Sequence, residues 1–464
     1  MRKLTKKSQM FFYAIGGLGV NMLNLMMGSY LCSAIIASGF KSEAIANQTF
    51  LGIDLVVAAV WGVFGVVAKI VDGIIDVPMA SFTDNLKTKL GRRRPALIIG
   101  LIPMIISYVV FTLVTPNPGG ATLLNTIFYG IVLCVFYSFY TLTMVTYYAT
   151  FTEIVETQKE RNFMSNVKSV CDIVYFILGY VLVSAMLKGM NIRLVAMIVL
   201  PLVLTMLIPL FLIKEKSTLP EDQAADAEQP PKTVNLIESI ACTFRNKNYI
   251  LWMIVYSFMT FGVQLFLSGI NEYFSVAGMS MMYIMMGAFA PVPFTLIIYN
   301  KLTKKFGFGF SFRYILIIFA VGMAAMFGVA FMEAGTLKTV LAILTGVISS
   351  FGIGAMFSVA YSVPSQLAAD EEKKTGVSNA AMYFAVQGLF AGVASGIGGS
   401  LVLTALKKTI ISTPLPAHME QKGTMLITLI SAIAMLVAFG LTFMLPKSVQ
   451  KMGQEEKTAV KKED

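Results

Sequence analysis

Long apolar stretches separated by short polar segments occupy almost the whole chain. Each stretch is long enough to cross a membrane as a helix, because about 20 largely apolar residues span the hydrocarbon, and helices satisfy their own backbone in lipid. The pattern predicts an all-α membrane protein. Its twelve expected transmembrane helices lie near residues 11–39, 51–80, 95–115, 120–151, 164–189, 194–214, 248–275, 280–300, 311–333, 337–365, 377–406 and 424–445.

The longest polar stretch lies in the middle of the chain, at residues 215–247. Its prolines, mixed charges and lack of apolar periodicity predict a flexible linker, and Asn235–Tyr249 fits a short amphipathic surface helix. We therefore expect a six-helix half at 1–214, the linker at 215–247, a second six-helix half at 248–446 and a cytoplasmic tail at 447–464.

Two basic loops indicate that the halves are repeated. DNLKTKLG at Asp84–Gly91 follows span two, and NKLTKKFG at Asn300–Gly307 follows span eight. Repeated halves are a transporter architecture. The alternative of two unrelated loops stays open, since cytoplasmic loops are basic in any case.

Composition excludes most other classes. Of 464 residues, 56% are apolar and only 13% are charged, against about 25% charged in soluble domains. This excludes a soluble globular enzyme, a disordered protein and a nucleic-acid binder. The four cysteines have no CxxC spacing, which indicates neither a disulfide framework nor a zinc site. A single histidine, His418, excludes a two-histidine metal site.

Lysine and arginine predict the orientation. With the amino terminus inside, the cytoplasmic segments and their flanks carry 28 of these residues and the outer loops carry 7, while Lys69 lies within a span. Both termini are therefore expected in the cytoplasm of a plasma (inner) membrane protein. The first apolar stretch is expected to be a retained helix rather than a signal peptide. The net charge of +11 then reflects topology and attraction to anionic membrane lipid.

Span two carries three ionisable residues, Lys69, Asp72 and Asp76, whose spacing places them on one helical face. Two carboxylates one turn apart repel each other at membrane depth unless a bound cation, a proton or the Lys69 ammonium neutralises them. Lys69 offsets one negative charge and leaves the other for Na⁺ or H⁺. The alternative, a permanent Lys–Asp pair that joins helices, stays open.

The segment Lys69–Pro95 resembles the second helix and following loop of the glycoside–pentoside–hexuronide:cation symporters, a family of the major facilitator superfamily. The family pattern has a basic residue, Asp-x-x-x-Asp-Pro, a basic loop and Gly-Arg-x-Arg-Pro. Lys69, Asp72, Asp76 and Gly91–Pro95 match it, although Val77 separates the second aspartate from its proline. Weaker matches are Tyr13–Asn21, Glu160–Arg161 with Lys168, and Asn246–Lys247.

The second half matches this family less well. Its loop Ala369–Gly376 is shorter than usual, and Gly392 stands where the family's eleventh-helix lysine is expected.

The resemblance implies the major facilitator fold and cation-coupled symport, with Asp72, Asp76 and Thr141 binding the cation. Ile75 stands where a ligand asparagine is expected. Na⁺ needs several oxygen ligands whereas a proton needs one carboxylate, so we expect H⁺, or Na⁺ held weakly. Asp72 and Asp76 would be metal ligands only if Na⁺ is the coupling ion, and no other cofactor is expected.

The substrate site departs from the family, because Met144 stands where a sugar-binding aspartate is expected. The remaining groups suit a hydroxylated or anionic solute such as a hexuronide. The tyrosines have packing or interface roles as their alternative, and Glu272 is a weaker candidate. The substrate-binding candidates are Asn21, Lys69, Tyr140, Met144, Tyr148, Lys168, Asn271 and Tyr273.

Asp84, Gly91, Arg92 and Arg94 resemble the superfamily's cytoplasmic gate, in which a carboxylate at a helix end meets arginines. Ordinary positive-inside charge is the alternative. Asp172 lies four residues after Lys168, which predicts an intrahelical ion pair.

The leading hypothesis is a monomeric secondary symporter for a small-molecule substrate such as a sugar, glycoside or uronate. The alternative is a transporter of the same fold for an amphiphile, such as a lysolipid or a drug, since Met144 suits an apolar cavity. A receptor or scaffold would not need the acidic pair of span two. The chain shows no nucleophile–base set and no phosphate-binding loop, so we expect neither an enzyme nor an ATP-driven pump.

Overall fold

The computed structural model describes residues 4, 6–84, 86–154, 158–215, 217–219, 246–375, 380–410 and 422–452. Most of the predicted linker, its amphipathic part up to Arg245, His418 and residues 453–464 lie outside the described residues. Within these ranges the regular structure is helical, and the β-structure is limited to two isolated bridges. The expected all-α fold is therefore confirmed.

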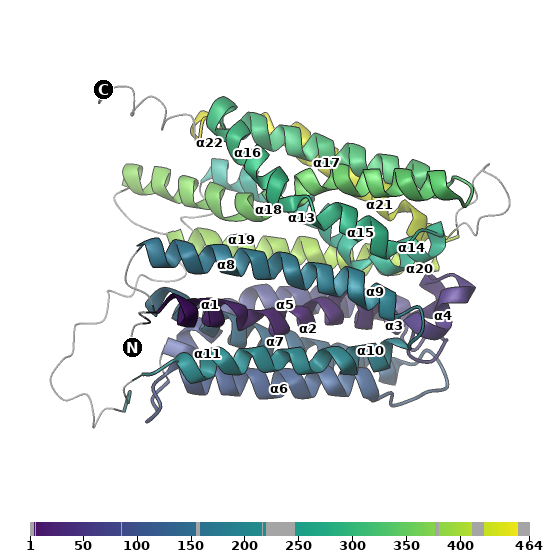
Figure 1. Ribbon diagram of the computed structural model, residues 1–464, viewed down its shortest axis with the longest axis horizontal. Helices are drawn as coiled ribbons and strands as arrows, with labels where there is room; N and C mark the ends of the chain where they lie inside the picture. Colours follow the sequence, from purple (N-terminus) through teal and green to yellow (C-terminus); the bar gives the residue numbers. More distant parts are fainter. Residues whose placement is uncertain are drawn as a thin grey trace. The chain divides into compact units, whose positions relative to one another are not determined.

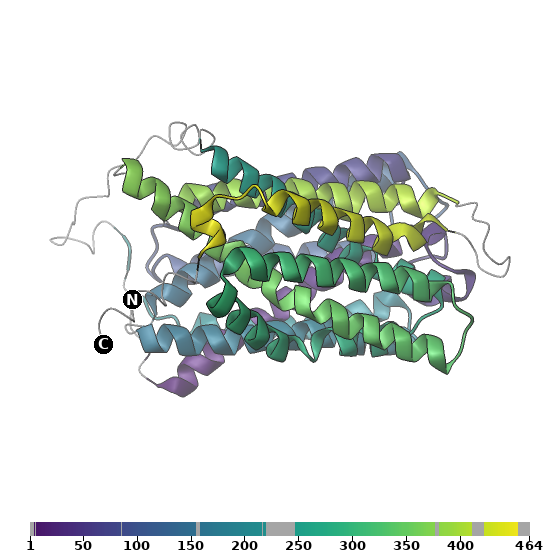
Figure 2. The same ribbon diagram turned by 90° about the horizontal axis from the view of Figure 1, so that it is seen from above.

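The chain divides into two compact units. The first comprises Met1–Ser38 and Ser42–Lys232, and the second comprises Gly39–Lys41 and Thr233–Asp464. Within each unit the long helices run roughly parallel to one another (Figures 1 and 2).

The helices up to residue 212 follow the predicted spans in chain order (Figure 1). They are α1 (Lys7–Ile15), α2 (Gly17–Leu25), η1 (Met26–Leu31), α3 (Cys32–Ala34), η2 (Ala37–Gly39), α4 (Ser42–Gln48), α5 (Ala58–Asp84), α6 (Arg93–Leu113), α7 (Leu123–Glu153), α8 (Gln158–Ile177), η3 (Leu178–Leu182), α9 (Val183–Met186), α10 (Ile192–Val199), η4 (Leu200–Met206) and α11 (Leu207–Leu212). Of the η segments, η1 and η3 are π-helical, while η2 and η4 are 3₁₀ helices.

The described helices after the linker belong to the second unit. They are α13 (Lys247–Ser268), α14 (Ile270–Ala277), α15 (Met281–Phe289), α16 (Val292–Phe306), α17 (Phe308–Ala330), α18 (Thr336–Thr375), α19 (Ala380–Gly396), the π-helix η6 (Ile397–Val402), α20 (Leu403–Lys408), the 3₁₀ helix η7 (Gly423–Leu426), α21 (Ile427–Thr442) and α22 (Lys447–Gln450).

Eleven helical stretches among the described residues are long and apolar enough to cross a membrane. The remaining predicted span, 164–189, corresponds to α8, η3 and α9, where the apolar stretch Val170–Met186 is shorter. Lys168 and Asp172 bring charge into α8. This charged part of α8 contributes to the candidate site.

Local sequence signals explain several helix ends. Thr122 caps the start of α7 by accepting a hydrogen bond from the Asn125 backbone N–H at 3.2 Å, and Asn246 caps α13 through the N–H groups of Asn248 and Tyr249. Gly278 ends α14 with a left-handed conformation (φ 61°) that glycine adopts without steric strain.

The π-helical turns η1 and η3 meet inside the first unit. The Tyr30 hydroxyl donates to the Gly179 carbonyl at 2.7 Å, and the hydroxyls of Ser29 and Tyr180 lie 3.1 Å apart. A π-helical turn disturbs the regular backbone ladder, so these side chains tie together two irregular segments. The contact joins the first predicted span to the fifth.

Candidate functional site

Asp72 forms the centre of a charged cluster in the first unit. Its Oδ2 lies 3.6 Å from Nζ of Lys69, one turn earlier on α5, and its Oδ1 accepts a hydrogen bond from the Thr141 hydroxyl of α7 at 2.8 Å. Both charged side chains are about a quarter exposed, 25% for Lys69 and 27% for Asp72. The structure thus brings together three predicted residues, Lys69, Asp72 and Thr141.

Tyr137 completes this cluster and was not predicted from the sequence. Nζ of Lys69 lies 3.8 Å from the centre of the Tyr137 ring, within the range of a cation–π interaction. Tyr137 is buried and precedes Thr141 by one helical turn of α7, so both side chains lie on one helical face. The sequence shows that Tyr137 and Thr141 lie on one helical face. The contact of Tyr137 with Lys69 follows only from the packing of α7 against α5.

The side chain of Asp76, the other predicted cation ligand, lies outside the described residues, although α5 continues through its position. Among the side chains that the structure does describe, no group of three or more Asp, Glu, His or Cys residues gathers to hold a metal ion. Cation binding by Asp72, Asp76 and Thr141 therefore stays a prediction.

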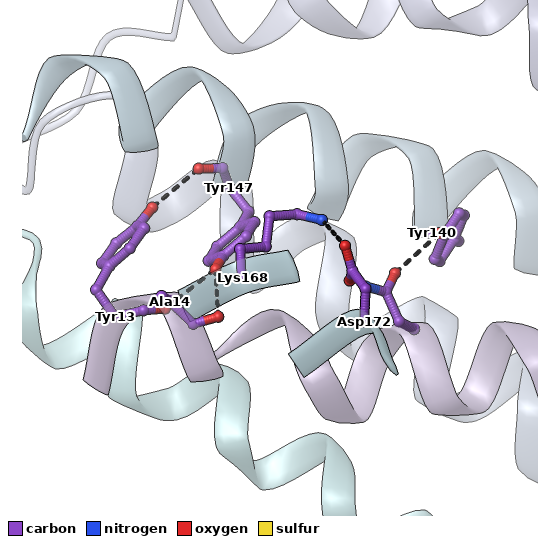
Figure 3. Close-up of polar contacts among 7 residues, drawn as sticks. Tyr13, Ala14, Tyr140, Tyr147, Lys168 and Asp172 are labelled. Carbon is purple, nitrogen blue, oxygen red and sulfur yellow. Dashed lines mark hydrogen bonds and ion pairs between the residues drawn. The ribbon is translucent and has the colours of Figure 1, made fainter. Parts of the chain in front are cut away.

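A second polar group lies on α2, α7 and α8. The Tyr140 hydroxyl donates to Oδ1 of Asn21 at 3.2 Å. Nζ of Lys168 lies 2.6 Å from Oδ2 of Asp172, which confirms the predicted intrahelical pair, and 5.1 Å from the centre of the exposed Tyr148 ring. Figure 3 shows Lys168, Asp172 and Tyr140 in one region. Amide, carboxylate, ammonium and aromatic groups together suit a hydroxylated or anionic solute.

Tyr147 has a packing role instead. Its hydroxyl donates to the backbone carbonyls of Tyr13 and Ala14, and the Tyr13 hydroxyl donates to the Tyr147 carbonyl at 2.9 Å (Figure 3). The two rings are stacked with centres 5.1 Å apart. This arrangement agrees with the packing alternative for Tyr147. Met144, one turn before Tyr148 on α7, is buried.

The predicted residues of the second unit are buried on α14. Tyr273 donates its hydroxyl proton to the Met326 carbonyl at 2.8 Å, so this proton is already used within the fold. Asn271 and Glu272 are also buried, and Oε1 of Glu272 lies 2.5 Å from Nζ of Lys407. Lys407 was not predicted as a partner. Substrate binding by Asn271 and Tyr273 stays a prediction.

The loop that carries the predicted gate residues also holds a buried arginine, and the gate itself stays a prediction. Arg93 is buried, and its guanidinium donates to the Thr83 hydroxyl at 3.1 Å. The Arg92 and Arg94 side chains are half-buried. The side chain of Asp84 lies outside the described residues.

Glu215 is the described carboxylate that contacts this loop. Its Oε2 accepts a hydrogen bond from the Arg93 backbone N–H at 2.7 Å. The lack of a side chain at Gly91, which has a φ of 85°, leaves room for Glu215. Thr218 adds a hydrogen bond from the Thr88 N–H to its hydroxyl at 2.9 Å. The loop is thus attached to the segment after α11, a contact between residues far apart in the sequence.

A pocket of about 300 Å³ lies elsewhere in the second unit, between the turn after α14 and the start of α18. Gly278, Ser280 and Lys338 contribute to its lining. The Lys338 ammonium donates to three backbone carbonyls, which gives it a structural role. None of the predicted substrate residues lines this pocket.

Two units of membrane-length helices, with a charged cluster on one of those helices, indicate a multi-pass membrane protein of the major facilitator fold. The chain belongs to the MFS/sugar transport protein family, whose model matches residues 12–447. The family and the solved structures of the same fold are transporters rather than enzymes. Family membership confirms the resemblance to major facilitator sugar transporters.

One curated relative is a lactose permease from Leuconostoc lactis, 25% identical over 182 residues. The match covers 36% of this chain and 27% of the permease, so it spans about a quarter of that relative's length.

Several solved transporters share the fold. The nucleoside transporter NupG has a TM-score of 0.59 at 15% identity, with 95% of this chain and 99% of that chain covered. An inward-facing, unoccupied bacterial homolog of the human lysosomal transporter Spinster has a TM-score of 0.60 at 13% identity, covering 96% and 97%. An inward-facing bacterial homologue of the iron transporter ferroportin has a TM-score of 0.57 at 11% identity, covering 95% and 99%. At these identities the likeness shows the fold alone.

Proposed function

We propose that this protein is a cation-coupled symporter of a sugar, glycoside or uronate in the plasma membrane. The contact of Asp72 with Lys69 and Thr141 carries the proposal, because ionisable groups within membrane helices are costly and mark ion or substrate pathways. Membership of a sugar-transport family and the partial match to a lactose permease support this substrate class.

The charge balance of α5 supports coupling to one monovalent cation. Lys69 offsets Asp72, which leaves the negative charge of Asp76, one turn further along the helix, for the coupling ion. A proton needs only that carboxylate, and Ile75 supplies no ligand oxygen to Na⁺. We take H⁺ as the coupling ion and weakly held Na⁺ as its alternative. Filling the site would allow the six-helix halves to rock around the substrate.

The polar groups of α2, α7 and α8 support a hydroxylated substrate. The Asn21–Tyr140 hydrogen bond can be exchanged for hydrogen bonds to sugar hydroxyls, and the exposed Tyr148 ring offers a stacking face. Lys168 supplies the positive charge that a uronate carboxylate needs.

Met144 favours a second function. A buried methionine at a position where this class of symporter uses an aspartate makes the site more apolar. Transport of a lysolipid or an amphiphilic drug by the same fold is therefore the alternative.

Uptake into proteoliposomes tests both functions. Labelled neutral sugars, glycosides and uronates would be offered under imposed H⁺ or Na⁺ gradients, to the wild type, to Asp76→Asn and to Glu43→Gln, which removes an exposed carboxylate of α4. The proposal requires gradient-driven accumulation of one solute that Asp76→Asn loses and Glu43→Gln keeps. If no sugar, glycoside or uronate accumulates and a labelled lysolipid is transported, the alternative is favoured.

A further inference from the structure

Both carboxylate oxygens of Asp72 already have partners. Oδ2 lies 3.6 Å from the Lys69 ammonium, and Oδ1 accepts a hydrogen bond from the Thr141 hydroxyl at 2.8 Å. A Na⁺ ion bound at this carboxylate would be repelled by the positive charge of the ammonium beside it. The fold therefore supplies its own counter-ion at Asp72.

Tyr137 fixes the position of this counter-ion. A lysine side chain is long and flexible, and without a second contact its ammonium could turn away from Asp72. The buried Tyr137 ring lies 3.8 Å from the ammonium, and its electron-rich face attracts a cation. Ring and carboxylate attract the ammonium together, so Lys69 is held beside Asp72.

We propose that Lys69, positioned by Tyr137, is a built-in cation that excludes Na⁺ from Asp72 and so limits coupling to H⁺. This inference rests on the proposed symport and names its ion selectivity. Lys69 determines the selectivity through its charge, whereas Tyr137 acts through Lys69 and is a positioning residue. Removing the ammonium should convert Asp72 into a Na⁺ site, with the Thr141 hydroxyl as a further oxygen ligand.

Thermal unfolding of the purified full-length protein in detergent tests the proposal without any substrate. Melting temperatures would be compared in NaCl, KCl and choline chloride at equal ionic strength. The wild type should show no shift specific to Na⁺. Lys69→Met, which removes the charge and keeps a long side chain, should gain a Na⁺-specific rise of about 2 °C or more, since a ligand that binds the folded state stabilises it.

Three further variants identify the cause. Lys69→Met combined with Asp72→Asn should lose the Na⁺ response, because no charged ligand remains. Tyr137→Leu should gain a smaller Na⁺ response than Lys69→Met, and Tyr137→Phe, which keeps the ring face but loses the hydroxyl that also hydrogen-bonds Lys69, should gain a smaller one still. A merely structural role of Tyr137 would lower the melting temperature equally in all three salts.

Two outcomes would overturn the proposal. The first is a Na⁺-specific rise in the wild type that Asp72→Asn abolishes, because Asp72 would then bind Na⁺ despite Lys69. The second is a folded Lys69→Met protein with equal melting temperatures in Na⁺ and K⁺. If Lys69→Met is not recovered folded, the same comparison on Tyr137→Leu decides. Either failure leaves symport itself standing, since only the uptake experiment tests that.

Discussion

The ammonium of Lys407, at the end of α20, lies 2.5 Å from Oε1 of Glu272 on α14, and both side chains are almost completely buried. Moving two charges out of water costs free energy, which their attraction offsets only while both are present. The described hydrogen bonds leave Oε2 of Glu272 without a donor. The stability of the second unit should therefore depend strongly on the charge balance of this pair.

Lys407→Met should destabilise the protein by about 3–5 kcal/mol, because it leaves the buried Glu272 carboxylate without its counter-charge. The double variant Glu272→Gln with Lys407→Met should recover a large part of this loss, since no unpaired charge remains. Lys408→Met, which removes the neighbouring exposed lysine, should change stability little and is the matched control. Thermal unfolding in detergent measures all three. If the double variant is no more stable than Lys407→Met, the unpaired charge of Glu272 is not the cause of the loss in the single variant.

Glu215 should stabilise the loop before α6, since its carboxylate accepts the Arg93 N–H at a helix start, where backbone donors lack partners and negative charge is favoured. Glu215→Ala should cost about 1 kcal/mol and speed hydrogen exchange of the Arg93 amide. Glu215→Gln, which keeps an acceptor oxygen, should lie between the two. Equal exchange in all three proteins would mean that the contact contributes nothing measurable.

Gly19 should be intolerant of a side chain, because a Cβ there would overlap the backbone of Leu202 in η4. Overpacking of this kind costs about 1–3 kcal/mol, more than the gain in helix propensity from alanine. Gly28 is the matched control, since a Cβ there would lie 3.5 Å from the Tyr137 hydroxyl, an ordinary contact. Thermal unfolding should therefore show a clear loss for Gly19→Ala and little change for Gly28→Ala. Equal changes in melting temperature for Gly19→Ala and Gly28→Ala would indicate that η4 shifts to make room for the added Cβ.

The sequence predicted the features that local spacing determines. Membrane helices follow from apolar runs, and the Lys168–Asp172 and Lys69–Asp72 pairs follow from positions one turn apart on a helix. The fold class could also be predicted, because the family motif at Lys69–Pro95 lies in one continuous segment.

The contacts that the sequence did not predict join residues on different helices. Tyr137 meets Lys69 only because α7 packs against α5. Glu215 reaches Arg93 across four predicted spans, and no periodic pattern connects Glu272 with Lys407. Each side chain alone has an ordinary local role, as a packing aromatic, a loop charge or a helix-end lysine. Tertiary packing assigns the partner.

Asp172 should set how well the protein accepts an anionic sugar. Its carboxylate lies 2.6 Å from the Lys168 ammonium and balances the charge that a uronate would otherwise meet. In Asp172→Asn the ammonium keeps its place near the Tyr148 ring but loses its counter-charge. The ratio of kcat/KM for a uronate to that for the matching neutral sugar should rise about tenfold, or about 1.4 kcal/mol.

A larger rise is not expected, because both side chains are partly exposed and solvent screens their charges. Lys168→Met should lower the same ratio below that of the wild type, and Glu43→Gln should leave it unchanged. Initial uptake rates of both sugars, measured over a concentration series in proteoliposomes, provide the ratio. Parallel losses for the two sugars in both variants would show that Lys168 and Asp172 support α8 without meeting the carboxylate of the solute. A rise of the ratio in Asp172→Asn together with a fall in Lys168→Met would place the uronate carboxylate beside Lys168. The two sugars differ only in that charge.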